Sequence, residues 1–267
     1  METCGVITTY HKEGCNGYKK FKCNGICVCD EKTGINKKEE YFQNGGKKEG
    51  KYKMYFPNGQ ICKEVNYIND KKEGIFKIYH DNGCIYIEES YINDKKNGPY
   101  RKYFQDGELE LECNYINDEY DGIYVEYGGD GIIWSKCNFM NGKLNGESKS
   151  YHEDGIIEEE AYYINDKRDG ICKKYDEQGT LYIEYNYINC KLNNIKQYYK
   201  NGKIKSDCDY EDVNKYKHGI CKKYYKNGNI KSECNYINGK IEGEYKLYWN
   251  NGQLNKVYNY KNGKKVE

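Results

Sequence analysis

Hydrophobic and polar residues recur along this chain with a period of 24 residues. Glycines at 50, 74, 98, 122, 146 and 170 are spaced by this interval, Asn194 stands where the next one is expected, and Gly219 and Gly243 resume the series. Counted from this glycine as position 0, position 5 is Tyr, position 9 is Gly, position 11 is Ile or Leu, and position 17 is Tyr except for Phe139. A fixed period of this length is typical of a repeat architecture.

Each copy is predicted to form a β-hairpin. Positions 8 and 9 read Asn-Gly or Asp-Gly in most copies, as at Asn58 and Gly59. They lie between two β-prone segments that are rich in Tyr and Ile. This dipeptide favours a two-residue type I′ turn, in which both residues have positive φ. We therefore place one strand at positions 1–7 and the next at positions 10–18. The segment "NDKKEG", from Asn69 to Gly74, then turns the chain toward the next copy.

A two-residue turn pairs residues whose positions add up to 17, and charged residues support this register. Position 0 faces position 17, so a tyrosine ring is expected to fill the space beside each glycine. Position 3 faces position 14, where opposite charges meet in seven of nine copies. These pairs are Lys53–Glu64, Lys77–Glu88, Arg101–Glu112, Lys149–Glu160, Lys173–Glu184, Lys196–Asp207 and Lys222–Glu233, whereas Val125–Lys136 and Lys246–Val257 break the rule.

The register divides the sheet into a polar face and an aromatic face. Positions 2 and 15, and positions 6 and 11, pair on the aromatic face, which a one-layer sheet leaves uncovered and available to a partner. The position-5 tyrosines form a stripe on the polar face, where we expect their rings to pack across strands. The candidate interaction surface consists of Phe56, Ile61, Phe104, Leu109, Tyr115, Tyr225, Ile230, Trp249 and Leu254.

The predicted fold is all-β, an elongated single-layer antiparallel meander of repeated hairpins. Residues 1–24 read as a cysteine-rich degenerate repeat or cap, and residues 25–267 as a repeat domain of about ten copies. If a four-residue turn joins successive hairpins, position 17 lies beside position 2 of the next copy. Each unit of such an array is stabilised mainly by its neighbours.

Composition narrows the functional classes. Charged residues make up 32% of the 267 residues but give a net charge of only +1, which argues against binding to nucleic acid driven by net charge. Mean hydropathy is −1.10 and 33 residues are tyrosine, so an aliphatic core is not expected. Fourteen cysteines without a signal peptide or a membrane-length apolar run predict an intracellular, cytoplasmic protein with mostly free thiols.

The phrase Gly-x-x-Lys-x-Tyr-x-x-Asn-Gly-x-Ile-x-x-Glu-x-x-Tyr-x-Asn-Gly-Lys resembles the MORN repeat, in the variant written here as "YYKNGNIKSECNYINGK" from Tyr224 to Lys240. The resemblance covers residues 25–267. It implies a one-layer meander of hairpins with no common catalytic residue. Relatives act as scaffolds, lipid-interacting or membrane-apposed modules and partner-binding proteins, and bacterial relatives of this variant include antitoxin-like members. This chain departs from the pattern in its many cysteines and in using "YIND" where "YxNG" is usual.

We therefore expect a non-catalytic repeat scaffold that binds a protein partner, with a lipid or membrane surface as a further class of partner and no cofactor. Exposed end strands also allow a homodimer. One alternative is an antitoxin or immunity-type inhibitor of a toxin enzyme. A lower alternative is a carbohydrate or cell-wall binding repeat protein, but such repeats use recurring tryptophans, and Trp134 and Trp249 fall at different repeat positions. Leucine-rich repeats fit the period but not the residues.

The cysteines suggest small apolar fillers more than ligands. Cys4, His11, Cys15, Cys23, Cys27 and Cys29 cluster near the start but lack Cys-x-x-Cys spacing, so no metal site is assigned. Cysteines 113, 137, 208 and 234 all fall at position 15, and equivalent positions in adjacent copies are about 9.6 Å apart, too far for a disulfide. Cys221 and Cys234 face each other at positions 2 and 15. We predict that this pair alone among the repeat cysteines has disulfide-compatible geometry.

Catalytic signatures are lacking. His80 and His152 occupy position 6, where other copies have aromatic residues, so we interpret them as packing residues. The repeat brings together no Ser-His-Asp group, and "YGGDG" at Tyr127 lacks the Lys and Ser or Thr of a phosphate-binding loop.

Two breaks in the period are the best local candidates for a bend or a docking loop. The copy at Asn194 loses its glycine and one residue, and the junction "YEDVNKYKHG" from Tyr210 gains two. Deleting Asn214 and Lys215 is expected to leave folding intact, and to impair partner binding if the junction docks a partner.

Overall fold

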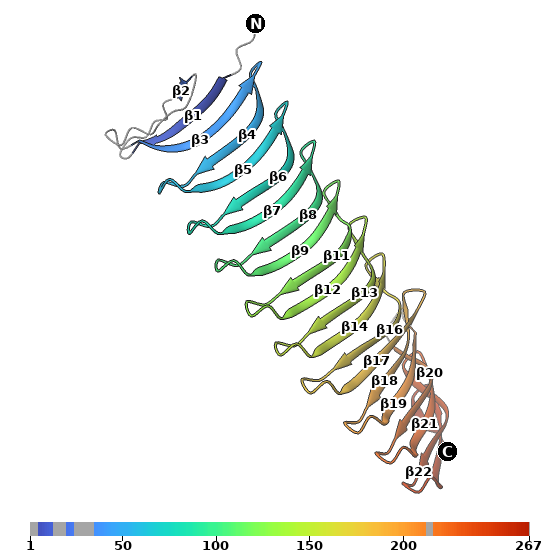
Figure 1. Cartoon of the computed structure of the whole chain (residues 1–267). Helices are drawn as coiled ribbons and strands as arrows, with labels where there is room; N and C mark the ends of the chain where they lie inside the picture. The colour runs from blue at the N-terminus through green and yellow to red at the C-terminus, as the bar shows by residue number, and fades with distance from the viewer. Residues whose placement is uncertain (1–4, 13–19, 24–34, 212–215, 267) are drawn as a thin grey trace. The chain divides into compact units, whose positions relative to one another are not determined.

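The computed structural model describes residues 5–12, 20–23, 35–211 and 216–266, all of which form β-strands and turns. The chain divides into two compact units, Met1–Ile132 and Ile133–Glu267. In each unit successive strands lie side by side in one open antiparallel layer, with turns along both edges (Figure 1). The predicted fold class, an all-β single-layer meander of repeated hairpins, is confirmed.

Unit 1 contains the strands that precede residue 133. They are β1 Gly5–Lys12, β2 Lys20–Cys23, β3 Ile35–Asn44, β4 Lys47–Tyr55, β5 Ile61–Ile68, β6 Lys71–Tyr79, β7 Ile85–Ile92, β8 Lys95–Tyr103, β9 Leu109–Ile116, β10 Glu119–Tyr120 and β11 Gly122–Tyr127. From β3 onward each strand pairs with the next, with β10 and β11 both paired to β9, whereas β2 and β3 both pair with β1. The proposed cap, residues 1–24, therefore includes two strands of the sheet.

Unit 2 continues the same plan. Its strands are β12 Ile133–Met140, β13 Lys143–Tyr151, β14 Ile157–Ile164, β15 Lys167–Arg168, β16 Gly170–Tyr175, β17 Leu181–Ile188, β18 Lys191–Tyr198, β19 Ile204–Glu211, β20 Tyr216–Tyr224, β21 Ile230–Ile237, β22 Lys240–Tyr248, β23 Leu254–Lys261 and β24 Lys264–Val266. Here too the pairing is sequential, with β15 and β16 both paired to β14.

The predicted hairpin register is confirmed along most of each hairpin. In the hairpin of β4 and β5, Gly50 faces Tyr67, Tyr52 faces Val65 and Lys53 faces Glu64. The same strands also pair across the outer turn, where Glu64 faces Lys77. The charged residues therefore form a ladder of alternating sign that passes from one hairpin to the next.

The inner turn is not the predicted two-residue type I′ turn, and that turn type occurs at the outer turn instead. At the inner turn only Gly59 has positive φ, Gly59 N–H donates to the Phe56 carbonyl at 2.9 Å, and Phe56 N–H donates to the Gln60 carbonyl at 2.8 Å. This is a type I turn followed by a left-handed glycine, which adds a residue and shifts the register. As a result Tyr55, and not Phe56, faces Ile61, so the predicted pairing of positions 6 and 11 is wrong.

The outer turn is the two-residue type I′ turn. Asn69 and Asp70 have φ of 51° and 67°, and Ile68 faces Lys71 across them. Asn and Asp tolerate positive φ better than other non-glycine residues, which explains why this dipeptide recurs here. Because the loop has two residues and not four, Tyr67 lies opposite Lys72, and not beside position 2 of the next copy.

Each outer hairpin before that of β23 and β24 also contains a bulge, which is the reason for the repeat glycine. Glu64 and Asn66 are two residues apart on β5, but their partners Lys77 and Glu73 are four apart on β6. Gly74 lies in the extra segment with φ of +80°, a conformation that favours glycine. No atom lies within 4 Å of the place where its Cβ would be, so the expected filling by a tyrosine ring does not occur there.

The copy at Asn194 shows that the bulge and the glycine belong together. On β17 Asn186 and Tyr187 are adjacent, and their partners Asn194 and Leu192 are two apart, so this junction has one extra residue instead of two. Asn194 has no positive φ. The lost residue and the lost glycine at this break in the period are therefore one change: a shorter bulge that needs no left-handed residue.

The aromatic face is the core of each sheet, and side chains of the sheet cover it. In unit 1 Tyr41, Tyr52, Val65, Phe76 and Tyr91 are between 4% and 7% exposed. The position two residues before each repeat glycine supplies the cover: Lys48 Nζ lies 4.5 Å from the centre of the Tyr52 ring, and Lys72 Nζ lies 4.3 Å from the centre of the Tyr91 ring. The expectation that a one-layer sheet leaves this face open is therefore wrong in this part of the unit.

Candidate interaction surface

The residues predicted as an interaction surface lie mainly near the inner turns, and most are half-buried. Tyr115 packs on the aromatic face between Tyr100 and Tyr120, with ring centres 5.7 Å and 4.7 Å away. Trp249 and Leu254, in the last inner turn, are 56% and 54% exposed. The half-buried members are Phe56, Ile61, Phe104, Leu109, Tyr115, Tyr225 and Ile230. The structure does not gather the predicted set into one exposed patch.

Position 6 instead links one copy to the next. Tyr225 Oη donates to the Tyr248 carbonyl at 2.9 Å, and His152 Nε2 lies 3.3 Å from the Tyr175 carbonyl. Asn82 at position 8 makes a similar link, since its amide donates to the Gln105 carbonyl at 2.9 Å. These residues hold neighbouring inner turns together, which gives the position-6 histidines a hydrogen-bonding role besides packing.

The polar face carries the charge ladder and the position-5 tyrosines. Lys77 Nζ lies 2.9 Å from Glu88, and Lys149 Nζ lies 3.3 Å from Glu160. The tyrosines reach across to the same carboxylates: Tyr175 Oη donates to Glu160 at 2.9 Å. Burial and this hydrogen bond raise the pKa of Tyr175 to about 12. The tyrosine stripe is therefore built into the polar network of the sheet.

Outer turns are joined by a hydrogen-bond pair that sequence reasoning missed. Asp70 N–H donates to the Lys48 carbonyl at 3.0 Å, and Lys48 N–H donates to Asp70 Oδ1 at 2.6 Å. In unit 2, Leu144 N–H donates to Asp166 Oδ1 at 2.8 Å. Where the chain has Gly239 in place of the aspartate, only the backbone bond to the Lys217 carbonyl remains. The signal was the recurring "YIND", whose aspartate accepts a bond that a glycine cannot.

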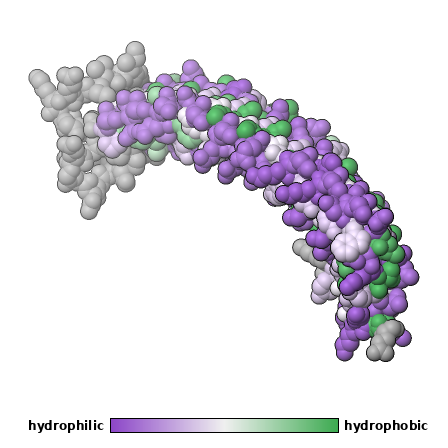
Figure 2. Space-filling model, turned by 90° about the horizontal axis from the view of Figure 1, so that it is seen from below, coloured by the Kyte–Doolittle hydropathy of each residue, from purple (hydrophilic) through white to green (hydrophobic). Residues whose placement is uncertain are grey.

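An exposed apolar row runs along these outer turns on the polar face, and we call it the outer row. Its members are the position-18 residues Ile68, Ile92 and Ile116 in unit 1 and Met140, Ile164, Ile188 and Ile237 in unit 2, which are 38% to 52% exposed. Figure 2 shows apolar side chains as separate patches on a largely polar surface. The outer row was not predicted, because the sequence pattern directed attention to the aromatic face.

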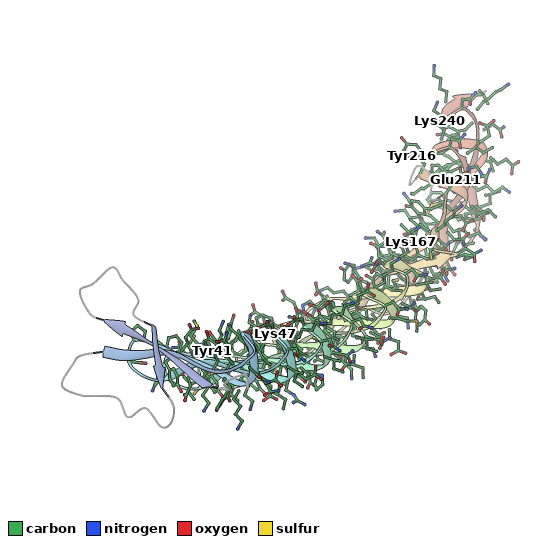
Figure 3. The ribbon with its side chains drawn as sticks, turned by 90° about the horizontal axis from the view of Figure 1, so that it is seen from above. Tyr41, Lys47, Lys167, Glu211, Tyr216 and Lys240 are labelled. Atoms are coloured by element: carbon green, nitrogen blue, oxygen red, sulfur yellow. A yellow bond between two sulfur atoms is a disulfide. The ribbon has the colours of Figure 1, made fainter. Side chains whose placement is uncertain are left out.

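Exposed lysines accompany the outer row. Position 21 faces position 18 directly across the type I′ turn, and it is an exposed Lys in most copies. The outer turns with Lys167 and Lys240, and between them the pair Glu211 and Tyr216, can be followed in Figure 3. The Ile–Lys and Met–Lys pairs are Ile68–Lys71, Ile92–Lys95, Met140–Lys143, Ile164–Lys167, Ile188–Lys191 and Ile237–Lys240.

The predicted cysteine geometry needs correction. Cys221 faces Cys234 as predicted, but it also faces Cys208 across the outer hairpin, and the disulfide joins Cys208 to Cys221 with Cα atoms 3.9 Å apart. The statement that Cys221–Cys234 is the sole compatible pair is therefore wrong, because it did not consider pairing between position 15 and position 2 of the next copy. Cys234 is a buried free thiol, and burial raises its pKa.

The buried carboxylate of the aromatic face, Glu89, is paired within the sheet. Glu89 is buried at position 15, where other copies have apolar residues, but Lys96 Nζ lies 2.8 Å from its carboxylate and Tyr91 Oη donates to it at 2.7 Å. No group of three His, Cys, Asp or Glu side chains within residues 35–211 and 216–266 is placed to hold a metal ion.

Two parts of the sequence prediction lie outside the described residues. Cys4, Cys15, Cys27 and Cys29, and the junction residues Asn214 and Lys215, belong to this group. A separate finding concerns membranes: none of the described segments is a helix long and apolar enough to span one.

The comparisons with known proteins agree with the repeat. A family model described as "MORN repeat variant" matches eight segments of the chain, and no curated protein shows significant similarity. The matched segments are residues 48–69, 72–93, 96–117, 144–165, 168–189, 193–212, 217–238 and 241–262. The copy between residues 117 and 144, which is unmatched, includes Val125 and Lys136, where the charge rule fails.

Proposed function

Because the chain belongs to the MORN repeat variant family, whose repeats generally mediate contacts with proteins or membranes, we propose that it is a non-catalytic scaffold that binds a protein partner through the outer row. The exposed outer row is the observation that carries this proposal. In unit 1 Lys48, Lys72 and Lys96 cover the aromatic face, and the inner turns of each unit are bonded to one another. The outer row is a repeated apolar feature that stays exposed in both units, and the position-1 isoleucines Ile75, Ile123, Ile171 and Ile220 form a second one.

The position of the outer row suits a scaffold. A type I′ turn holds each apolar side chain of the outer row beside a lysine, except Ile116, which faces Glu119, and the aspartate bonds between outer turns fix successive copies. A partner would therefore meet a surface that is already ordered, which lowers the entropic cost of binding. The inhibitor of a toxin enzyme and the carbohydrate-binding protein stay predictions without a specific structural feature in their favour.

Affinity capture with the full chain tests the proposal. Wild-type protein, the variant Ile164→Asp/Ile188→Asp, and the control Trp249→Ala/Leu254→Ala are each used to capture proteins from cells of the source, which are then identified by mass spectrometry. We expect the proteins enriched by the wild type to be lost with the outer-row variant and retained with the control. Urea unfolding checks that both variants fold.

Four results would overturn the proposal. Retention of the same partners by the outer-row variant would move the site elsewhere. Loss of partners with the control alone would instead favour the residues Trp249 and Leu254 near the last inner turn. Capture of one stoichiometric enzyme would support the inhibitor reading, and co-sedimentation with lipid vesicles in place of protein capture would support a membrane surface.

A further inference from the structure

Three successive outer turns of unit 2 combine apolar side chains with an excess of positive charge. Met140 faces Lys143, Ile164 faces Lys167, and Ile188 faces Lys191. We call these six residues the unit-2 patch. Met140, Ile164 and Ile188 are 52%, 38% and 52% exposed, and the three lysines are exposed as well.

The acidic groups of these turns are already engaged by backbone donors. Asp166 Oδ1 accepts the Leu144 N–H at 2.8 Å, and Asp169 Oδ1 accepts the Cys190 N–H at 2.8 Å. No described acidic side chain forms an ion pair with the three lysines of the patch. Their ammonium groups therefore present hydrogen-bond donors and positive charge beside exposed apolar surface, which is complementary to an acidic ligand with apolar side chains.

The spacing of the patch indicates the conformation of such a ligand. Successive outer turns are two strands apart, or about 9.6 Å at ~4.8 Å per strand. A polyproline II segment repeats every third residue at about 9.3 Å. An α-helix presents every seventh residue at about 10.5 Å, and an extended strand presents same-face residues at about 6.7 or 13 Å. The polyproline II segment fits best, and its backbone carbonyls, which make no internal hydrogen bonds, can accept from the lysines.

We propose that the unit-2 patch binds an acidic segment of a partner protein in the polyproline II conformation, with an apolar residue at every third position. One apolar residue meets Met140, Ile164 or Ile188 in turn, and the acidic residues between them meet the lysines. This inference rests on the proposed function and names the chemistry of the partner segment.

Fluorescence anisotropy with the full chain tests it. The probe is a labelled synthetic peptide of repeated Leu-Glu-Pro triplets. The first control peptide has the same composition with its leucines placed together, and the second is an acidic helical peptide with leucine at every seventh position. Vesicles of phosphatidylcholine and phosphatidylserine are the fourth probe. Two charge variants complete the design: Lys167→Glu/Lys191→Glu in the patch, and Lys200→Glu/Lys226→Glu at the exposed inner turns, which makes the same change in net charge.

We expect the triplet peptide to bind the wild type more tightly than either control peptide, and the patch variant to weaken this binding roughly tenfold or more, as for charged groups that face each other in a complex. The inner-turn variant should weaken binding of the triplet peptide by less than about twofold. Added salt should weaken binding for every pair of protein and peptide that binds.

Several results would overturn the inference. They are the absence of peptide binding, equal binding of the triplet and clustered peptides, tighter binding of the helical peptide, an equal effect of the two charge variants, and binding of vesicles alone. If the triplet peptide fails while Ile164→Asp/Ile188→Asp still loses the captured partners, the scaffold function stands and only the chemistry of the partner segment falls.

Discussion

Asp94 and Lys72 exchange two hydrogen bonds between neighbouring outer turns: Asp94 N–H donates to the Lys72 carbonyl at 3.0 Å, and Lys72 N–H donates to Asp94 Oδ1 at 2.6 Å. The lysine side chain meanwhile lies over the ring of Tyr91. One residue pair thus connects the outer edge of the sheet to the cover of its aromatic core.

Two substitutions of Asp94 distinguish the contribution of its side-chain hydrogen bond from that of its positive φ. Asp94→Ala removes the acceptor and places a less tolerant residue at a φ of 68°, so we expect a loss of about 1–2 kcal/mol in unfolding free energy. Asp94→Asn keeps an oxygen acceptor and tolerates this φ, so its loss should be less than about 1 kcal/mol. Urea unfolding measures both, and equal losses would show that the carboxylate bond contributes nothing.

The repeat glycines should differ in their sensitivity to alanine. Gly74 has open space around its missing Cβ, so Gly74→Ala should cost only the left-handed backbone, about 1–2 kcal/mol. At Gly219 an added Cβ would lie 3.0 Å from Asp209 Cβ and Oδ2, and Asp209 accepts the Ile220 N–H at 3.1 Å. Gly219→Ala should therefore lower the urea midpoint further than Gly74→Ala, and a smaller effect at Gly219 would contradict the bulge geometry.

The bond between Tyr175 and Glu160 predicts a dependence of stability on pH. The tyrosine hydroxyl, and then Lys149, lower the pKa of Glu160 below 4.5, so the stabilisation from this carboxylate is present above that pH and is lost as pH falls through the lower folded value. The pKa of Tyr175 is raised from 10.0 to about 12, so its contribution is present below pH 10 and is lost as pH rises toward 12.

Tyr175→Phe tests this linkage. We expect a loss of about 1 kcal/mol near neutral pH, because the carboxylate loses a donor. The difference from wild type should shrink as pH falls below 4.5. Urea unfolding across the acid range gives the measurement, and Tyr182→Phe, at a side chain that is 45% exposed, is the control. A difference that stayed constant with pH would show that packing alone accounts for it.

The states of Cys208, Cys221 and Cys234 can be tested chemically. After digestion without a reductant, mass spectrometry should find Cys208 linked to Cys221, and Cys234 should react with iodoacetamide only after unfolding, because it is buried and its pKa is raised. Cys208→Ser should lower the unfolding free energy by about 2–3 kcal/mol, as expected for a short closed loop. Recovery of a Cys221–Cys234 link instead would reverse the assignment.

The sequence was sufficient for the register but not for the turns. Lys53 and Glu64 and the equivalent pairs set the partners across each hairpin, because opposite charges at fixed separation leave few alternative registers. The dipeptide Asn58–Gly59 is compatible with two turns. A positive φ at both residues makes a type I′ turn, whereas a positive φ at the glycine alone makes the observed type I turn followed by a left-handed glycine. The outer turn was predicted with the wrong length because Asn69–Asp70 is a weaker type I′ signal than Asn-Gly.

The interaction surface was misplaced for a related reason. With a four-residue outer turn, Lys72 would not lie opposite Tyr67, and the aromatic face would have no cover. With a two-residue turn, the lysine stem lies over the rings and Ile68 is left exposed on the other face. A change of two residues in loop length thus decided which apolar side chains meet solvent, and this geometry depends on backbone angles that composition does not specify.

The side-chain hydrogen bonds between outer turns and between inner turns have a consequence for the history of the chain. Asp94 reaches back 22 residues and Asn82 reaches forward 23, so each bond addresses the adjoining copy and none of the others. A gene duplication that adds one whole copy would therefore reproduce every such bond at its new border. Duplication or deletion of one copy can therefore change the length of the repeat array in steps of one hairpin, and the remaining copies need no compensating substitutions.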